Sequence, residues 1–122
     1  MTTKPPLSAE AVAADQPNIQ IWRLKGKMMG STCCYDFLEA VRDNIENGQI
    51  QAILDMSDVR FANSTGVGVL ASIFTAAKDA DGVMHLVGVN DRVQSVLKVI
   101  NLWYVVSTHE TMDGALASIA EG

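Results

Sequence analysis

The chain has 122 residues, of which 48% are hydrophobic and 19% are charged, as expected for one globular domain. Its formal net charge is −5, and its nine Lys and Arg residues are scattered singly along the sequence, which argues against a nucleic-acid-binding protein. We find no signal peptide and no apolar run near the roughly 20 residues that span a bilayer, so we expect a cytoplasmic protein without membrane insertion.

The chain is expected to fold as one unit with a short tail. Residues 1–8 include Pro5-Pro6, which opposes helix, and are predicted to form a flexible N-terminal tail. Residues 9–122 contain no linker, internal repeat or low-complexity tract, so they are predicted to form a single domain.

The first half of this domain predicts two strands and a helix. Ala9 to Ala14 is a candidate first strand, although its alanines are poor strand formers. Ile19 to Leu24 alternates apolar and polar residues, which is typical of a half-buried strand. Ser31 or Thr32 can cap a helix in which apolar residues recur at helical spacing as far as Gly48.

The middle of the chain predicts a buried strand, a loop and a long helix. Ile50 to Asp55 is an aliphatic run ending in an acid, typical of a central strand. Met56 to Ala62 is predicted to be a loop leading to Asn63-Ser64, where a helix begins that runs to about Gly82. Val83 to Val87 is predicted to be another short apolar strand.

The C-terminal third repeats this alternation. Asn90 or Asp91 is expected to cap a helix, Tyr104 to Val106 to form a short strand, and Thr108 or Glu110 to open a terminal helix. Strands and helices alternate with short connections, so we predict an α/β fold with one sheet and helices packed on it.

The adjacent hydroxyls Ser64 and Thr65 are the most informative feature of the chain. With Asn63 as N-cap they occupy the first positions of a helix, where backbone N–H groups favour negative charge. They either cap the helix or accept a phosphate. Gly66 and Gly68 lie in the first turns, where glycine costs up to ~1 kcal/mol relative to alanine, which indicates another backbone or body approaching closely, and a docked protein would explain both.

Other chemistries have little support in the sequence. Gly66-x-Gly68-x-x-Ala71 formally matches a dinucleotide fingerprint but does not directly follow a strand, and Ser64 lies in no G-x-S-x-G motif. The adjacent Cys33-Cys34 and the two separate histidines, His85 and His109, have no metal-ligand spacing. We therefore expect no cofactor, no metal and no enzymatic activity, with one buried and one half-exposed thiol on a helix.

Bulky apolar residues in or beside predicted loops point instead to a protein partner. Such residues often mark interaction surfaces, and here they are Met28, Met29, Phe61, Val67 and Trp103.

The stretch from Ile50 to Ile119 resembles a STAS domain, the fold shared by bacterial anti-sigma-factor antagonists and the cytosolic tails of sulfate transporters. The family's Asp-Ser-Ser/Thr-Gly-Leu-Gly-Val-Leu pattern is matched here by Asn63-Ser64-Thr65-Gly66-Val67-Gly68-Val69-Leu70. The other matching features keep the family order: the strand ending in Asp55, then Val59 and Phe61, the strand Met84 to Gly88, the helix Arg92 to Leu97, and a final helix with Ala115-Leu116.

This resemblance implies a mixed sheet of about four to five strands with about four helices packed on it, spanning residues 9–122. It implies a partner-switching protein that binds an anti-sigma factor with serine kinase activity and is released when that kinase phosphorylates Ser64, with Thr65 as second choice. A PP2C-type phosphatase would reverse the reaction. The implied partner-binding residues are Met28, Met29, Phe61, Asn63, Ser64, Thr65, Gly66, Val67 and Gly68.

Two departures and one alternative accompany the resemblance. Asn63 stands where the family has an acid, which removes a charge beside the acceptor serine, and Gly26-Lys27-Met28-Met29 lacks the acid of the family's early turn. The alternative function is that of a STAS interaction subunit of a transporter or sensory complex that is never phosphorylated.

Overall fold

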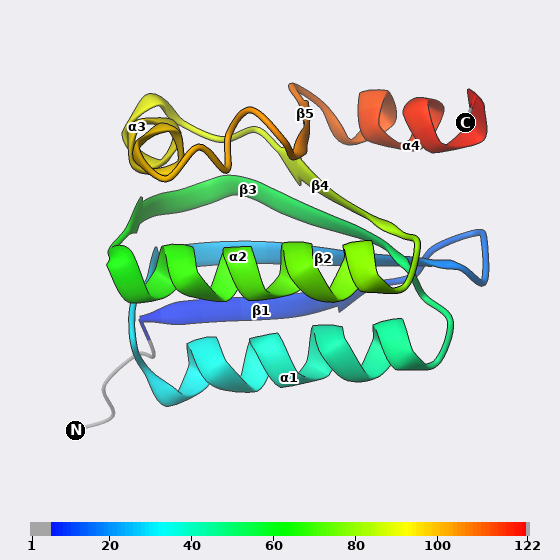
Figure 1. The fold of residues 1–122 in the computed structure, drawn as a ribbon, viewed down its shortest axis with the longest axis horizontal. Helices are drawn as coiled ribbons and strands as arrows, with labels where there is room; N and C mark the ends of the chain where they lie inside the picture. The colour runs from blue at the N-terminus through cyan, green and yellow to red at the C-terminus, as the bar shows by residue number, and fades with distance from the viewer. Residues whose placement is uncertain (1–5, 122) are drawn as a thin grey trace.

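The computed structural model describes residues 6–121 and contains a five-stranded sheet with four helices (Figure 1). The strands lie in the order β1-β2-β3-β4-β5, with β1 antiparallel to β2 and the other neighbours parallel. This confirms the predicted mixed sheet and helix number. In chain order the elements are β1 (Leu7–Val12), β2 (Ile19–Met28), α1 (Thr32–Glu46), β3 (Gln51–Ala62), α2 (Ser64–Asp79), β4 (Val83–Val87), α3 (Asp91–Val99), β5 (Ser107–His109) and α4 (Met112–Glu121).

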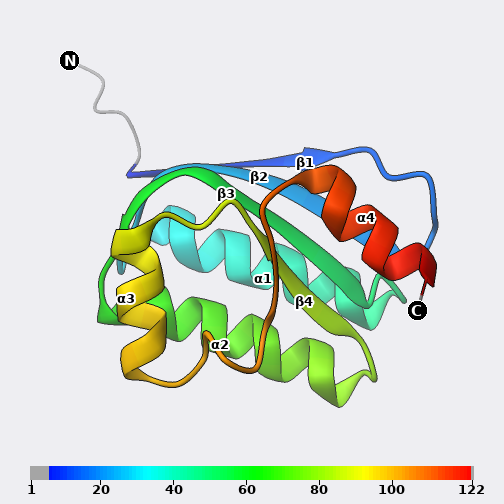
Figure 2. The same ribbon diagram turned by 90° about the horizontal axis from the view of Figure 1, so that it is seen from above.

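The helices cover the two faces of the sheet unequally. Helices α1 and α2 lie together on one face, where the main hydrophobic core forms, whereas α4 lies over part of the other face (Figure 2). A smaller cluster fills the space beneath α4 and consists of Ile19, Ile21, Ile53, Val87 and Ala115. Helix α4 therefore covers one end of the second face of the sheet.

Strand β2 shows why the second face is only partly covered. Its residues alternate between faces, so that Trp22 and Leu24 join the main core while Ile19 and Ile21 lie under α4. Farther along the strand, exposed Lys25 replaces the buried aliphatic residues. The sequence thus changes from apolar to cationic where the cover of α4 ends.

The first strand begins earlier than predicted. Leu7 is only 2% exposed and pairs with Gly26, and the backbone N–H of Lys27 donates to the carbonyl of Pro6 at 2.8 Å. The tail boundary predicted after residue 8 is therefore wrong, because a buried leucine and strand pairing hold this segment on the sheet. Residues 1–5 of the predicted tail lie outside the described residues.

The loop predicted over Met56 to Ala62 is also wrong, since β3 continues through it to Ala62. Here Met56, Val59 and Ala62 are buried, a spacing of three that hides the period of two used to recognise strands. The pairing of β2 with β3 shifts register at two points in this region, and such bulges break the alternation.

The predicted strand Tyr104 to Val106 is the third error. Tyr104 and Val105 are exposed, and the N–H groups of Val105 and Val106 donate locally to the carbonyl of Leu102. The strand is β5, directly after this turn, so apolar composition alone misplaced it. The predicted strand over Val83 to Val87 and the helix capped by Asn90 are confirmed, whereas α4 starts after Thr111, whose hydroxyl accepts from the N–H of Gly114.

His85 is buried in β4 and is held at both ring nitrogens. It is 3% exposed; its Nε2 lies 2.9 Å from Oε1 of Gln51, and its Nδ1 lies 3.2 Å from Nε2 of His109. In the matching tautomer, Nε2–H of His85 donates to Gln51 and Nδ1 accepts from His109. Burial first, and the neighbouring His109 second, lower the pKa of His85 to about 4.

This pKa predicts an acid-sensitive fold. The unfolded chain binds a proton on His85 near pH 6.5 while the folded chain does so only near pH 4, so stability is lost as pH falls through this window. The contribution is up to about 3 kcal/mol. Urea unfolding at pH 7 and pH 4.5 measures it, with His85→Leu as the comparison because this variant cannot titrate there. An equal loss of stability in both proteins would contradict the assignment.

Candidate functional site

Asn63 fixes the start of α2 by three hydrogen bonds. Its Oδ1 accepts from the N–H of Gly66 at 2.8 Å, its carbonyl accepts from the N–H of Val67 at 2.9 Å, and its own N–H donates to the carbonyl of Met28 at 3.1 Å. The N-cap predicted at Asn63 is confirmed. Asn63 therefore caps the helix through an amide oxygen, and its presence in place of the family's acid removes a charge and keeps the cap.

Ser64 is the accessible hydroxyl of the pair. It is the first residue of α2 and is exposed, whereas Thr65 is half-buried beside Gly30, where an added Cβ would come within 3.0 Å of the Thr65 methyl. The first N–H groups of a helix have no partner within the helix and carry partial positive charge. A phosphate on Ser64 would lie at this end of α2 and face solvent.

The two glycines of this segment have different reasons for being glycine. Gly66 is buried, and a Cβ there would collide with the carbonyl oxygen of Met28 and lie 2.6 Å from its carbonyl carbon. Its small size is therefore required by the chain's own β2. The expected close approach of another backbone is thus confirmed at Gly66, whereas Gly68 is exposed with nothing within 4 Å of an added Cβ, and a docked protein there stays a prediction.

Several residues predicted for the partner surface are internal. Met28 is 0% exposed and Val67 is 3% exposed, so the exposure predicted for both is wrong. Both belong to the main core, because the end of β2 and the first turn of α2 pack against each other there. They support the surface from beneath, as Gly66 does.

Met29 and Phe61 remain partly accessible. Both are half-buried, and both line a hollow at the end of the sheet together with Lys27, Arg60 and Arg92. The guanidinium carbon of Arg92 lies 5.9 Å from the centre of the Phe61 ring, a cation–π arrangement. Apolar and cationic groups thus alternate next to the segment that carries Ser64.

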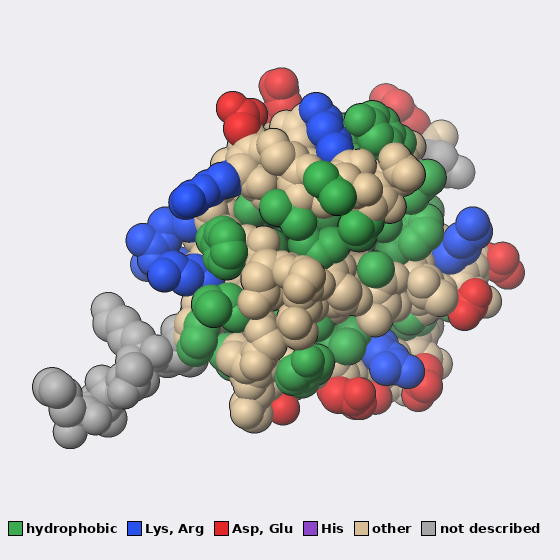
Figure 3. All heavy atoms as spheres, turned by 60° about the vertical axis from the view of Figure 1, so that its left-hand side comes forward, with side chains coloured by type: hydrophobic (Ala, Val, Ile, Leu, Met, Phe, Trp, Pro, Cys, Tyr) green, Lys and Arg blue, Asp and Glu red, His purple; other side chains and the backbone are tan. Residues whose placement is uncertain are grey.

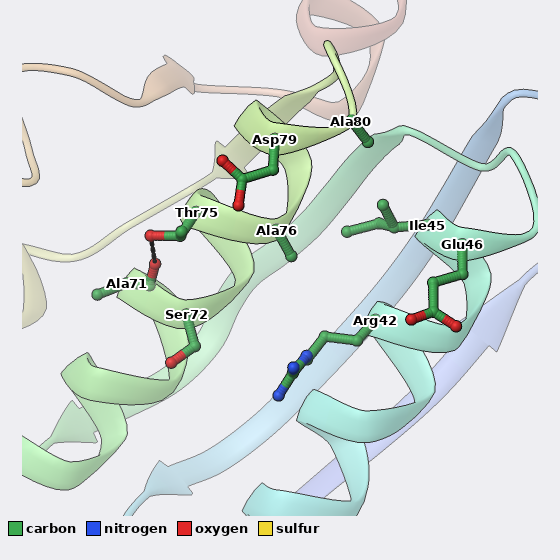
Figure 4. Close-up of a pocket in the computed structure, with 9 residues that line it drawn as sticks. All are labelled: Arg42, Ile45, Glu46, Ala71, Ser72, Thr75, Ala76, Asp79 and Ala80. Atoms are coloured by element: carbon green, nitrogen blue, oxygen red, sulfur yellow. Dashed lines mark hydrogen bonds between the residues drawn. The ribbon is translucent and has the colours of Figure 1, made fainter.

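A shallow groove separates α1 from α2 and has a volume of about 680 Å³ (Figure 4). Arg42 extends from α1 into the space between the helices, opposite Ser72 and Thr75 of α2. The Thr75 hydroxyl donates to the carbonyl of Ala71 at 3.1 Å. The α2 side of the groove includes small side chains, among them Ala71, Ser72 and Ala76, and Gly68 lies on the same face of α2, one helical turn before Ser72.

The clustering of cations at one end of the sheet was missed by sequence reasoning. Lys25 and Lys27 come from β2, Arg60 from β3 and Arg92 from α3, and all four are exposed around adjoining hollows. The spacing of these four residues in the sequence does not indicate that they lie close together in the fold. The alternation of Arg23, Lys25 and Lys27 on one strand was the available signal, because it places side chains on one face.

The thiols are placed as predicted, with Cys34 buried and Cys33 half-buried on α1. Burial chiefly, and Cys33 next, raise the pKa of the Cys34 thiol, which is therefore poorly suited to act as a nucleophile. Among residues 6–121, no three His, Cys, Asp or Glu side chains are grouped as metal ligands would be. Over the same residues, no helix has both the length and the apolar character needed to cross a bilayer.

Fold and site together define a small α/β domain that presents the N-terminus of α2, with an exposed serine, beside a mixed apolar and cationic surface. The chain belongs to the STAS domain family, whose model matches residues 10–115. This family membership confirms the resemblance seen in the sequence. Members of the anti-sigma antagonist group of this family are in general not enzymes.

Individual relatives agree with this assignment. A Thermotoga neapolitana protein named "Putative anti-sigma factor antagonist TM1081 homolog" is 31% identical over 75 residues, which are 62% of this chain and 66%, just under two thirds, of that protein. The anti-sigma factor antagonist SpoIIAA in its unphosphorylated form has the same fold, with a TM-score of 0.81, 16% identity, and coverage of 94% of this chain and 98% of that one. The phosphorylated form of SpoIIAA from Bacillus matches with a TM-score of 0.68 and 15% identity over 92% and 99% of the two chains.

Proposed function

We propose that this protein is a phosphorylation-gated anti-sigma-factor antagonist of the cytoplasm. It binds an anti-sigma factor that is also a serine kinase, and it is released when that kinase phosphorylates Ser64. A PP2C-type phosphatase restores the binding form. The names of its relatives support the class of partner, and the existence of a phosphorylated form of SpoIIAA supports the kind of modification.

The observation that carries the proposal is the position of Ser64. It is exposed, it opens α2, and the side chain of Asn63 leaves it free by capping the helix from the preceding residue. Phosphate adds about −1.5 to −2 charges and three acceptor oxygens. The helix N-terminus tolerates this charge, so we expect the effect to fall on the bound partner and not on the fold.

The accessible part of the proposed docking surface consists of Met29, Phe61, Asn63, Ser64, Thr65 and Gly68. A partner that packs against Gly68 comes close to the helix backbone, because no side chain stands between them. It would then lie within reach of Ser64, which is one helical turn earlier on the same face. The proposed phosphate would therefore enter the contact itself.

Phosphorylation in an extract of the source cells tests the proposal. With radiolabelled ATP, we expect the wild-type chain and Thr65→Ala to gain label and Ser64→Ala to gain none, since the exposed hydroxyl is removed only in the last. Label is located by peptide mass spectrometry, and thermal melts verify that all three proteins are folded. Undiminished labelling of Ser64→Ala, or no labelling of the wild type, would contradict Ser64 as the acceptor.

A further inference from the structure

The second face of the sheet has an uncovered end that is lined with cations. Helix α4 covers Ile19 and Ile21 near the start of β2. Beyond it, Lys25 and Lys27 are exposed on the same strand, and exposed Arg60 follows on β3. Figure 3 shows a group of Lys and Arg side chains at the left margin of the molecule, whereas the other margins carry separate Lys or Arg side chains together with Asp and Glu.

Two adjoining hollows make this end a groove. One has a volume of about 980 Å³ and includes Lys25 and Asp58 in its lining, and the other has a volume of about 420 Å³ and includes Phe61 and Arg92. They share Lys27, Met29 and Arg60. We call the combined depression the basic groove, which is lined by Lys25, Lys27, Met29, Arg60, Phe61 and Arg92.

Within the part of the chain that the structure describes, the cations of the basic groove are only partly balanced by acids. Among residues 6–121 the one ion pair is Arg42–Glu39 on α1, so none of these four cations has an ion-pair partner there. Two acids lie nearby: Asp58, which lines the groove opposite Lys25 in the strand register, and Asp91, which precedes Arg92. Four cations against two acids give a positive patch on a chain whose net charge is −5.

We propose that the basic groove is the docking site for an acidic segment of a protein partner, one that carries an apolar side chain among its carboxylates. Charge complementarity supplies the attraction, and the half-buried Met29 and Phe61 supply apolar contacts between the cations. The groove shares these two residues with the surface beside Ser64, so the inference rests on the proposed function in naming the chemistry of its partner.

A protein segment fits this groove better than a compact anion or a nucleic acid does. All four cations are exposed and come from three different elements, whereas a site for one small anion requires converging, buried donors. A nucleic acid would contact a wider surface, and the overall charge of −5 would repel it.

The test is a ¹H–¹⁵N NMR titration of the unphosphorylated chain with a short Glu-rich peptide that contains one Leu. We expect shifts confined to the basic groove, weakening with added salt, and none with the same peptide in which Gln replaces Glu. Shifts spread over the whole surface, or equal shifts with the Gln peptide, would overturn the inference. So would groove shifts produced by single-stranded DNA or anionic phosphatidylglycerol vesicles but not by the peptide.

Charge reversal supplies the matched variants. Lys27→Glu with Arg60→Glu is expected to weaken peptide binding by about tenfold, whereas Lys78→Glu with Lys98→Glu, outside the groove, leaves it unchanged. The spectra themselves verify folding, and equal affinities of the two double variants would overturn the inference. This test does not use Ser64, so absence of phosphate at Ser64 with intact peptide binding would count against the proposed function alone.

Discussion

Ser64→Glu is expected to weaken binding of the kinase partner by about a hundredfold, because a carboxylate placed in a docked surface meets unfavourable charge and desolvation. The partner for this measurement is the kinase recovered from source cells with the wild-type chain and then purified. Isothermal titration calorimetry gives the two dissociation constants. Thermal stability should be unchanged or slightly raised, since a negative charge at a helix N-terminus contributes about 0.3–1 kcal/mol.

Two controls separate charge from shape and position. Ser64→Gln introduces a side chain of nearly the same size as Glu but without its charge, and this variant is expected to bind the kinase partner much more tightly than Ser64→Glu. Ser118→Glu places the same charge on exposed α4, over the other face of the sheet, and is expected to bind like the wild type. Equal affinity of Ser64→Glu and the wild type would contradict the charge switch.

Gly66→Ala is expected to lower the free energy of unfolding by about 3 kcal/mol, which corresponds to a fall of about 10 °C in the melting temperature. The added methyl collides with the carbonyl of Met28, and this carbonyl also accepts the hydrogen bond from Asn63. Neither backbone can move without separating β2 from the start of α2. Chemical unfolding followed by circular dichroism measures the loss.

Gly68→Ala is the matched control on the same helix. Nothing lies within 4 Å of its added Cβ, so the better helix propensity of alanine should raise stability by up to about 1 kcal/mol. The same variant should weaken partner binding, because the methyl stands where the partner approaches the backbone. Equal destabilisation by the two variants would contradict the distinct roles given to Gly66 and Gly68.

Much of the fold could be predicted from local pattern. The helical spacing that ends near Gly48, the apolar run of β4 and the caps at Asn63 and Asn90 each depend on neighbours in sequence, and each is present in the structure. The errors arose where tertiary structure overrides such patterns. Bulged pairing hides the second half of β3, and the exposed Tyr104 and Val105 look like strand residues while forming a turn.

The candidate site was predictable in its centre but not in its surroundings. The position of Ser64 at the start of a helix follows from its place after a helix cap, which is local information, whereas its choice as the phosphate acceptor comes from the family resemblance and stays a prediction. Met28 looked exposed because it was predicted to lie in or beside a loop after the strand, yet β2 extends to Met28, its side chain is in the main core and its carbonyl fixes Asn63. The basic groove depends on β2, β3 and α3 meeting at one end of the sheet, and no sequence spacing encodes this meeting.

The proposed function also gives the Asn63 exchange a definite meaning. Because Asn63 Oδ1 already accepts the N–H of Gly66 at 2.8 Å, the helix does not need an acid there. The absence of this charge should therefore affect the interaction of the proposed kinase partner with Ser64, and not the helix itself. If Ser64 gains phosphate as proposed, the neutral amide beside it removes one repulsive neighbour.

The most direct measurement is mass spectrometry of the protein isolated from its own cells, with the peptide containing Ser64 and Thr65 fragmented to locate any phosphate. We predict a population carrying one phosphate on Ser64, removed by a PP2C-type phosphatase and absent when the chromosomal copy encodes Ser64→Ala. Protein that carries no phosphate in any growth phase, or carries it at Thr65 with Ser64 unmodified, would contradict the account.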